Sequence, residues 1–278
     1  MRLAISNIAW DIVEDEAIAA LLKRYGVDAI DVAPGKYFPD PVATTMSQIA
    51  EVRDRWADCG IGITGMQALL FGTQGLNVFG CAASRASMLQ HLSEVCRIGA
   101  GLGATRLVFG SPKNRDRSGL NDREAQDIAV TFFRALGDIA QDYALAFCLE
   151  PNPECYGANF MTNSPSTAQV VREVDHPNIL MQLDTGSLTI NGEDPFAVLK
   201  DHADLIGHVH ASERDLLTLG DGDTAHVDMA AAISRYLPDH VVSIEMLPNR
   251  VEPHLETIER ALNVAIRHYS ADVKGTLR

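Results

Sequence analysis

Residues 145–153 read LAFCLEPNP, an apolar run that stops at an acidic residue, with two prolines in the three residues that follow. A short apolar run bounded by turn residues is typical of a buried strand, and proline ends its pairing. Glu150 therefore stands where this strand leaves the core. The same event recurs in three later runs, at Asp184 in 179–186, His210 in 205–212 and Glu245 in 241–247.

Four earlier runs share this character, and amphipathic stretches with helical spacing separate all of them. The earlier strands are expected at 3–10, 29–34, 61–72 and 105–112. The helices are expected at 15–26, 46–60, 84–103, 123–143, 164–175, 193–203, 227–237 and 252–270. Strands that alternate with helices predict a parallel sheet, because parallel strands need crossover connections.

Eight such units in 278 residues predict a (β/α)8 TIM barrel, α/β in class, as a single domain over residues 1–278. The tail at 270–278 is expected to be flexible. An open doubly wound sheet is the structural alternative. It would normally carry a glycine-rich turn after its first strand, and the turn NIAWDI (7–12) has no glycine.

Composition limits the classes of function. The formal net charge is -14 and no run is rich in lysine or arginine, which disfavours binding to nucleic acid. The five cysteines form no CxxC pair and are expected to be reduced thiols. No apolar stretch reaches the ~20 residues that a membrane span needs, and no signal peptide is legible. We expect a cytoplasmic protein without a membrane partner; a homo-oligomer remains open.

The spacing of the four residues at the later strand ends predicts a metal site. Asp184 follows Glu150 by 34 residues, His210 follows Asp184 by 26, and Glu245 follows His210 by 35. Each step is close to one barrel unit of roughly 31 residues, so the four side chains are expected at one level of the C-terminal face. Carboxylates with one imidazole suit Mn²⁺ or Mg²⁺ and accept Co²⁺ or Zn²⁺. A cation also explains how three acids can share one apolar mouth.

Other polar residues are candidates for contact with a substrate. His208 lies two residues before His210 and so faces the same side of its strand. Lys113 and Arg115 lie in a loop after the fourth strand, on the active face of a barrel. The remaining candidates are Trp10, which would stack on a sugar from the end of the first strand, and Asn152, two residues after Glu150. For each, a structural or solvated role is the alternative.

Four fragments resemble the metal-binding strand ends of the xylose-isomerase-like TIM barrels: CLEPNP (148–153), LDTGS (183–187), HVHASERD (208–215) and SIEML (243–247). That superfamily includes sugar phosphate isomerases/epimerases, ketose 3-epimerases, hydroxypyruvate isomerase, inosose dehydratase and type IV endonucleases. The resemblance implies that Glu150, Asp184, His210 and Glu245 bind one divalent ion, with Mn²⁺ the first choice. It also implies that the two glutamates are the acid/base pair of a sugar isomerase or epimerase that works through a metal-stabilised enediolate.

The resemblance weakens where the ketose 3-epimerases grip their substrate. This chain has Ser187 where they carry a histidine, Tyr156 where they carry a glutamate, and Leu216 where they carry an arginine. Arg214, two positions before Leu216, is the candidate replacement for that arginine. The comparison implies a retained metal centre and a substrate, still a small carbohydrate, that differs from free ketohexoses.

Three rival functions stay open. A metal-dependent dehydratase of a keto-sugar or keto-inositol would use the same acids and metal. An abasic-site endonuclease would need more histidine ligands and a DNA-binding face. No histidine occurs in the expected strands at 29–34 and 61–72, and the net charge of -14 disfavours a DNA-binding face. A non-catalytic metabolite-binding barrel would keep its affinity when Glu150 is replaced.

Overall fold

The apolar runs form short strands in the computed structural model, which describes residues 1–249 and 251–270. Each strand has between four and seven residues. The strands are β1 (Arg2–Ser6), β2 (Ala29–Val32), β3 (Gly62–Met66), β4 (Arg106–Phe109), β5 (Ala146–Leu149), β6 (Ile179–Asp184), β7 (Ile206–Ser212) and β8 (Val241–Glu245).

Every strand pairs in parallel with the next one along the chain, and β8 closes the sheet against β1. In that closing pair Leu3 lies opposite Val242 and Ile5 opposite Ile244. Closure removes the unpaired edges that an open sheet would leave. The predicted (β/α)8 barrel is therefore confirmed, and the open doubly wound alternative is wrong.

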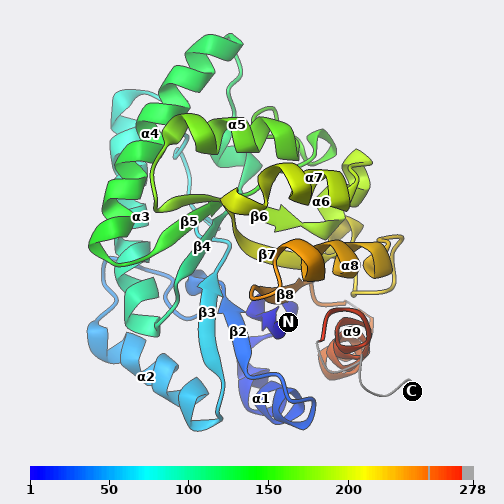
Figure 1. Ribbon diagram of the computed structural model, residues 1–278. Coiled ribbons are helices and arrows are strands. Elements are labelled where there is room, and N and C mark those ends of the chain that lie inside the picture. The colour runs from blue at the N-terminus through cyan, green and yellow to red at the C-terminus, as the bar shows by residue number, and fades with distance from the viewer. Residues whose placement is uncertain (250, 271–278) are drawn as a thin grey trace.

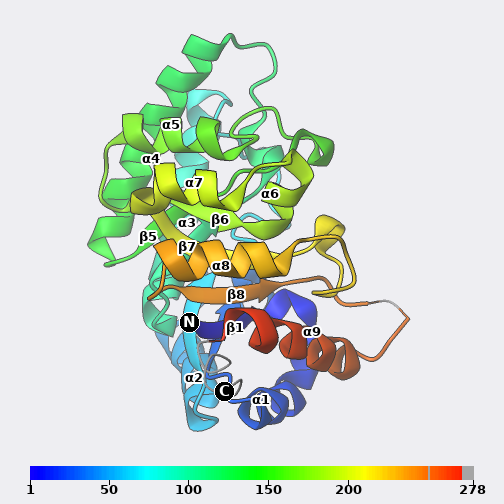
Figure 2. The same ribbon diagram turned by 45° about the vertical axis from the view of Figure 1, so that its right-hand side comes forward.

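Helices surround the barrel on its outside, as Figures 1 and 2 show from two directions. They are α1 (Asp15–Arg24), α2 (Met46–Asp58), α3 (Ala82–Leu102), α4 (Asp122–Asp142), α5 (Ser164–Val174), α6 (Thr185–Asn191), α7 (Pro195–His202), α8 (His226–Tyr236) and α9 (His254–Tyr269). Several begin at a capping residue that the sequence supplies. Thr45 caps α2 and Asn121 caps α4, each accepting from the backbone N–H three residues later.

The helix α6 differs from the prediction, which continued the sixth strand to residue 186. The strand ends at Asp184 and α6 begins at Thr185, with the Asp184 carboxylate accepting from the backbone N–H of Ser187 in the first helical turn. An aspartate is a favoured residue at this position because it satisfies a free N–H of the first turn. One side chain thus ends a strand, caps a helix and enters the candidate metal site.

The core lies between the barrel and its helices. All four residues of β5 are buried, as expected for a parallel strand covered on both faces. On the outside, α4 packs Phe133 edge-on against Phe109 of β4, with ring centroids 5.3 Å apart. This packing holds the strand ends at fixed positions, which is what a site built across several strands requires.

Two predicted boundaries are wrong near the open end of the barrel. The third strand was expected at 61–72, but β3 ends at Met66, and Ala68 adopts a left-handed φ of 53°. The first strand was expected to reach residue 10, but β1 ends at Ser6 and a short 3-10 turn follows. Of the tail expected to be flexible, 270–278, all but Ser270 lies outside the described residues. No helix within those residues has both the length and the apolarity to cross a bilayer.

Candidate metal centre

Four ligand-type side chains meet at the C-terminal ends of β5 to β8. Glu150 follows β5, Asp184 and Glu245 end β6 and β8, and His210 lies within β7. The register pairs Asp184 with His210, and pairs Glu245 with Ser212, two residues beyond His210. Each of the four offers one ligand atom, and these atoms lie within 4.8 Å of one another. The structure thus brings together the four residues that the sequence spacing selected.

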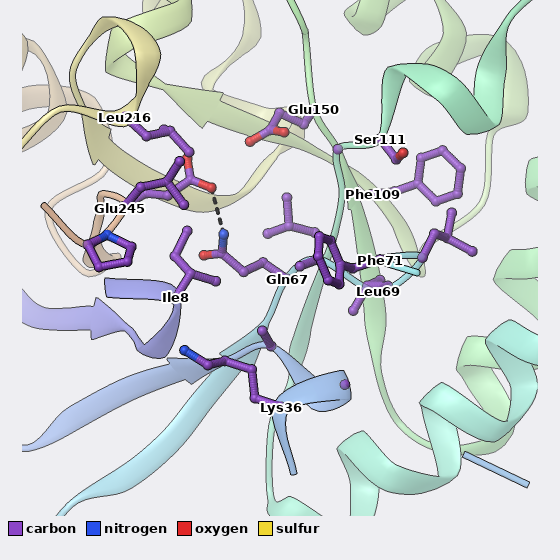
Figure 3. Close-up of a pocket in the computed structure, with 18 residues that line it drawn as sticks. Ile8, Lys36, Gln67, Leu69, Phe71, Phe109, Ser111, Glu150, Leu216 and Glu245 are labelled. Carbon is purple, nitrogen blue, oxygen red and sulfur yellow. Dashed lines mark hydrogen bonds between the residues drawn. The ribbon is translucent and has the colours of Figure 1, made fainter. Parts of the chain in front are cut away.

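The two glutamates are each held by one amide. Nδ2 of Asn152 donates to Oε2 of Glu150 at 3.0 Å, and Nε2 of Gln67 donates to Oε1 of Glu245 at 2.6 Å. Figure 3 shows the second of these bonds at the edge of the cavity. One oxygen of each carboxylate is therefore fixed, and the other one faces His210.

Asp184 is bound more completely than the glutamates. Its Oδ1 accepts from the backbone N–H of Ser187 at 2.6 Å, and its Oδ2 accepts from the hydroxyl of Ser212 at 2.6 Å. It does not line the cavity above the cluster. This arrangement suits a fixed ligand rather than a group that exchanges protons with a substrate.

His210 is the centre of the cluster and is fully buried. Its Nδ1 lies 3.2 Å from Oε2 of Glu245 and 3.5 Å from Oε1 of Glu150. Its Nε2 is buried and has no hydrogen-bond partner among the described residues. A buried nitrogen without a partner is unfavourable, and this one is not the ring nitrogen that lies near the two glutamates.

The electrostatics of the cluster show an excess of acid. Burial and the charges of Glu245 and Glu150 raise the pKa of Asp184 to about 7. Burial would lower the pKa of His210, but Glu245 and Glu150 raise it well above its usual value. Burial would raise the pKa of Glu245, yet His210 lowers it. One imidazolium cannot neutralise three carboxylates, so the residues present fit a divalent cation in charge and in donor type.

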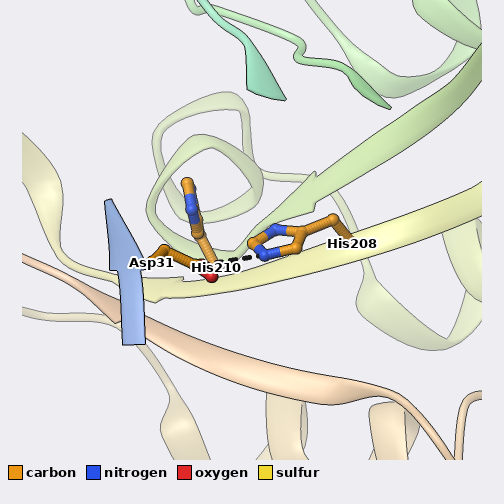
Figure 4. Close-up of side chains that lie close together, drawn as sticks. All are labelled: Asp31, His208 and His210. Atoms are coloured by element: carbon orange, nitrogen blue, oxygen red, sulfur yellow. Dashed lines mark hydrogen bonds and ion pairs between the residues drawn. The ribbon is translucent and has the colours of Figure 1, made fainter. Parts of the chain in front are cut away.

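His208 lies beneath this cluster rather than in the cavity. Its Nε2 lies 2.9 Å from Oδ2 of Asp31, and its Nδ1 lies 3.0 Å from the amide of Gln182. Its ring meets that of His210 at 90°, with centroids 5.0 Å apart, and Figure 4 shows the three side chains together. The structure therefore places His208 as a support for His210, and contact with a substrate is not supported.

Arg115 and Asn152 also support the cluster. Arg115 is fully buried, donates to the backbone oxygen of Glu150 at 2.7 Å, and donates to the side-chain oxygen of Asn152. Asn152 passes this restraint to the Glu150 carboxylate through its amide. Both were predicted to touch the substrate; instead they position Glu150, and neither lines the cavity.

Three further candidates lie away from the cavity. Trp10 is buried, and its indole N–H donates to Asp15 at 2.8 Å while its ring packs edge-on against Trp56. A stacking platform for a sugar would need an open face, which Trp10 lacks. Lys113 and Arg214 are exposed and are not among the residues that line the cavity.

A cavity of about 540 Å³ opens above Glu150 and Glu245 (Figure 3). Its walls come from the segments after β1 to β5, β7 and β8. Besides the two glutamates, its polar side chains are Gln67, Lys36 and Ser111. Sequence reasoning missed Lys36, because nothing in the sequence shows that the segment after β2 bends over the cavity.

Gly110 is a second residue that sequence reasoning missed. A Cβ atom at this position would lie 2.0 Å from Oε2 of Glu150. The only sequence signal was its place within the fourth strand expected at 105–112, and the structure ends that strand at Phe109, directly before Gly110. Its importance depends on the close approach of β4 and β5, which only the fold reveals.

Comparison with known proteins agrees with this architecture. The structure matches D-psicose 3-epimerase from Clostridium cellulolyticum H10, solved with D-tagatose, with a TM-score of 0.81 and 16% identity over 97% of this chain and 100% of that one. It matches 3-keto-D-glucoside 4-epimerase from E. coli with a TM-score of 0.77 and 16% identity, over 95% and 99% of the chains. The probable 3-DHS dehydratase AsbF from Bacillus anthracis gives 0.72 and 16%, over 95% and 98%.

At such low identity these three likenesses show a shared fold. No curated protein sequence matches the chain significantly. The family model described as xylose isomerase-like TIM barrel matches residues 19–267, which is most of the chain and includes all four residues of the cluster. The chain therefore belongs to the xylose isomerase-like TIM barrel family.

Proposed function

We propose that this protein is a divalent-metal-dependent isomerase or epimerase of a small sugar or sugar derivative. The observation that supports this most directly is the convergence of Glu150, Asp184, His210 and Glu245, whose ligand atoms lie within 4.8 Å of one another, beside a cavity that the two glutamates line. Structural neighbours named as sugar epimerases lend further support. Mn²⁺ is the ion we propose first, because three carboxylates with one imidazole form a hard, oxygen-rich set.

The four residues would hold the ion with one atom each. When bound, it would stabilise the negative charge that develops on the oxygens of an α-hydroxycarbonyl substrate as a C–H proton leaves. Asp184, whose oxygens already accept two hydrogen bonds, would act as a ligand only. His210, fully buried between the glutamates, would do the same.

Glu150 and Glu245 are our proposed acid/base pair. Both line the cavity, and they come from β5 and β8, so they reach a substrate from different sides. One would remove a proton from carbon and the other would return one. The amides of Asn152 and Gln67 hold each carboxylate while leaving its second oxygen available. Positioned groups of this kind contribute about 10²- to 10⁴-fold to a rate.

A dehydratase is the second candidate, supported by the structural likeness to a named dehydratase. The same proton abstraction would start the reaction, and expulsion of a β-hydroxyl as water would follow. Incubation with candidate keto-sugars in D₂O separates the two: exchange at carbon without loss of water supports the isomerase, and release of water supports the dehydratase.

The ligand assignment is tested by metal analysis of protein loaded with Mn²⁺. Wild type is expected to retain roughly one ion per chain, and Asp184→Ala and His210→Ala to lose it. Glu154→Gln, which removes an exposed acid from the same loop as Glu150, is the matched control. Full retention of the ion in both ligand variants would refute the assignment.

The acid/base assignment is tested by Glu245→Gln, which keeps an oxygen for the amide of Gln67. We expect deuterium exchange into the substrate to fall by about 10²- to 10⁴-fold, with an unchanged circular dichroism spectrum. Exchange at the wild-type rate would exclude Glu245 from proton transfer.

A further inference from the structure

We propose that the substrate carries an apolar substituent, such as an aryl group, beside its α-hydroxycarbonyl head. The substrate class would then be an aryl-substituted sugar derivative rather than a free or phosphorylated sugar. This inference rests on the proposed function, because it assumes that the head binds at Glu150 and Glu245. The cavity above those glutamates supplies the argument.

The polar groups of the cavity are concentrated at its floor or are already engaged. Lys36 is the only cation that the described part of the chain places in the lining, and its Nζ donates to the backbone oxygens of Asn7, at 2.8 Å, and of Trp10. The hydroxyl of Ser111 donates to Asn114 at 2.6 Å. A free sugar would bury several hydroxyls against these walls, and a buried hydroxyl without a partner is destabilising. Among the described residues that line the cavity, a phosphate would find no uncommitted cation.

The remaining walls are apolar. Leu69 and Leu70 line the cavity as buried side chains, and Phe71 and Leu247 line it with exposed fractions of 87% and 49%. Figure 3 shows Phe71 and Leu69 together, across the view from the two glutamates. Large apolar side chains exposed beside a cavity commonly mark a binding surface. The cavity thus pairs a polar floor with an apolar upper region.

The backbone around Leu216, another apolar residue of the cavity wall, is held in a strained conformation. Asp215 and Leu216 have left-handed φ angles of 56° and 52°, which cost about 1–3 kcal/mol each in non-glycine residues. The hydroxyl of Tyr156 accepts from the N–H of Asp215, and the oxygen of Leu216 accepts from the N–H of Leu247. These bonds fix Leu216 at the cavity wall, on the side opposite the loop that carries Phe71.

The cavity also has room for two groups. Its volume of about 540 Å³ lies within the ~300–1,000 Å³ of sites that take drug-sized ligands. Such a volume accommodates a sugar head together with a ring. The aryl group would lie between Leu216 and the segment from Leu69 to Phe71.

Calorimetry on the Mn²⁺-loaded protein tests the inference through binding alone. The probes are the phenyl and methyl glycosides of one 3-keto sugar, the free sugar and its phosphate ester. Burial of a ring of this size predicts that the phenyl glycoside binds about 10- to 100-fold more tightly than the methyl glycoside. Phe71→Ser is expected to reduce that ratio by about 3- to 10-fold.

Val13→Ser is the matched control, because Val13 is 85% exposed and does not line the cavity. It should leave the ratio unchanged. Equal affinities for the two glycosides, tighter binding of the phosphate ester, or failure of both glycosides to bind would overturn the inference. Failure of the proposed function has a different signature: the phenyl preference holds, but no probe exchanges deuterium.

Discussion

Glu150 shows how much of the candidate site depends on residues that do no chemistry themselves. Its carboxylate accepts from Asn152, whose side chain accepts from the buried Arg115. Arg115 also donates to the backbone oxygen of Glu150. A guanidinium that is fully buried loses hydration, and burial lowers the pKa of Arg115 to about 10. The two hydrogen bonds of Arg115 indicate that this buried guanidinium positions Glu150.

Gly110 permits that position. In Gly110→Ala, the new methyl carbon would lie 2.0 Å from Oε2 of Glu150, so the carboxylate must move. Because displacement of a reacting group by about 1 Å can cost on the order of 10²-fold, we expect turnover to fall by that factor. Gly35→Ala is the matched control: Gly35 also lines the cavity, yet its added carbon meets nothing within 4 Å. Equal activity in both variants would contradict this account.

At this scale, residue type and spacing predicted the cluster but not the contacts around it. Glu150, Asp184, His210 and Glu245 were recognisable because each interrupts an apolar run about one unit apart. The support by Arg115 was not recognisable. A basic residue in a loop of the active face is equally compatible with a substrate contact, and only the fold shows it buried.

At the scale of elements, the segment between β7 and α8 is held by one acid. Burial would raise the pKa of Glu213, but hydrogen bonds from His226, Thr224 and Gly220 lower it to about 2 from its ordinary 4.5. Nε2 of His226 lies 2.9 Å from the carboxylate, and Nδ1 of the same ring lies 2.7 Å from the hydroxyl of Tyr269 in α9. Glu213 therefore ties this segment to the start of α8 and, through His226, to α9.

The lowered pKa of Glu213 predicts the pH range in which this contribution to stability is lost. Since the carboxylate is favoured in the folded state, its contribution is complete above pH 4.5 and disappears as the pH falls toward 2. We expect Glu213→Gln to lower the free energy of unfolding in urea by about 1–3 kcal/mol at pH 7. The gap between wild type and variant should narrow from pH 5 to pH 3. A gap independent of pH would assign the effect to packing.

Helices and strands were predicted well where the hydrophobic periodicity is strong, and poorly where the conformation of a single residue ends the element. The long amphipathic α4 was expected at 123–143 and lies at Asp122–Asp142. The third strand was overextended because its apolar run continues beyond Met66, while the left-handed Ala68 turns the chain toward the cavity. Apolar residues that line a cavity resemble strand residues in sequence, so this error fell on a functional segment.

At the scale of the whole molecule, the candidate ligands come from four consecutive strands of the closed barrel. A barrel of eight units was predictable because each unit repeats the same alternation of strand and helix. The cluster concentrates negative charge where β5 to β8 end, in a chain whose net charge is already -14. Without a cation this part of the barrel carries unfavourable repulsion; burial, followed by the charges of Glu245 and Glu150, raises the pKa of Asp184.

This repulsion predicts that replacing Asp184 has different effects on thermal stability with and without a bound ion. A bound ion stabilises only the folded chain, because the four ligands come together only there; at 100 times its dissociation constant it adds about 2.7 kcal/mol. For a chain of this size that corresponds to a rise in Tm of roughly 5 °C. In EDTA at pH 8, Asp184→Asn should melt no lower than wild type, because it removes one of three crowded charges. In Mn²⁺ the same variant should lose the increase, whereas Glu154→Gln should keep it. Scanning calorimetry of the three proteins with EDTA and with Mn²⁺ measures both effects. A metal-free variant that melts well below wild type would mean that the hydrogen bonds of Asp184 outweigh the repulsion.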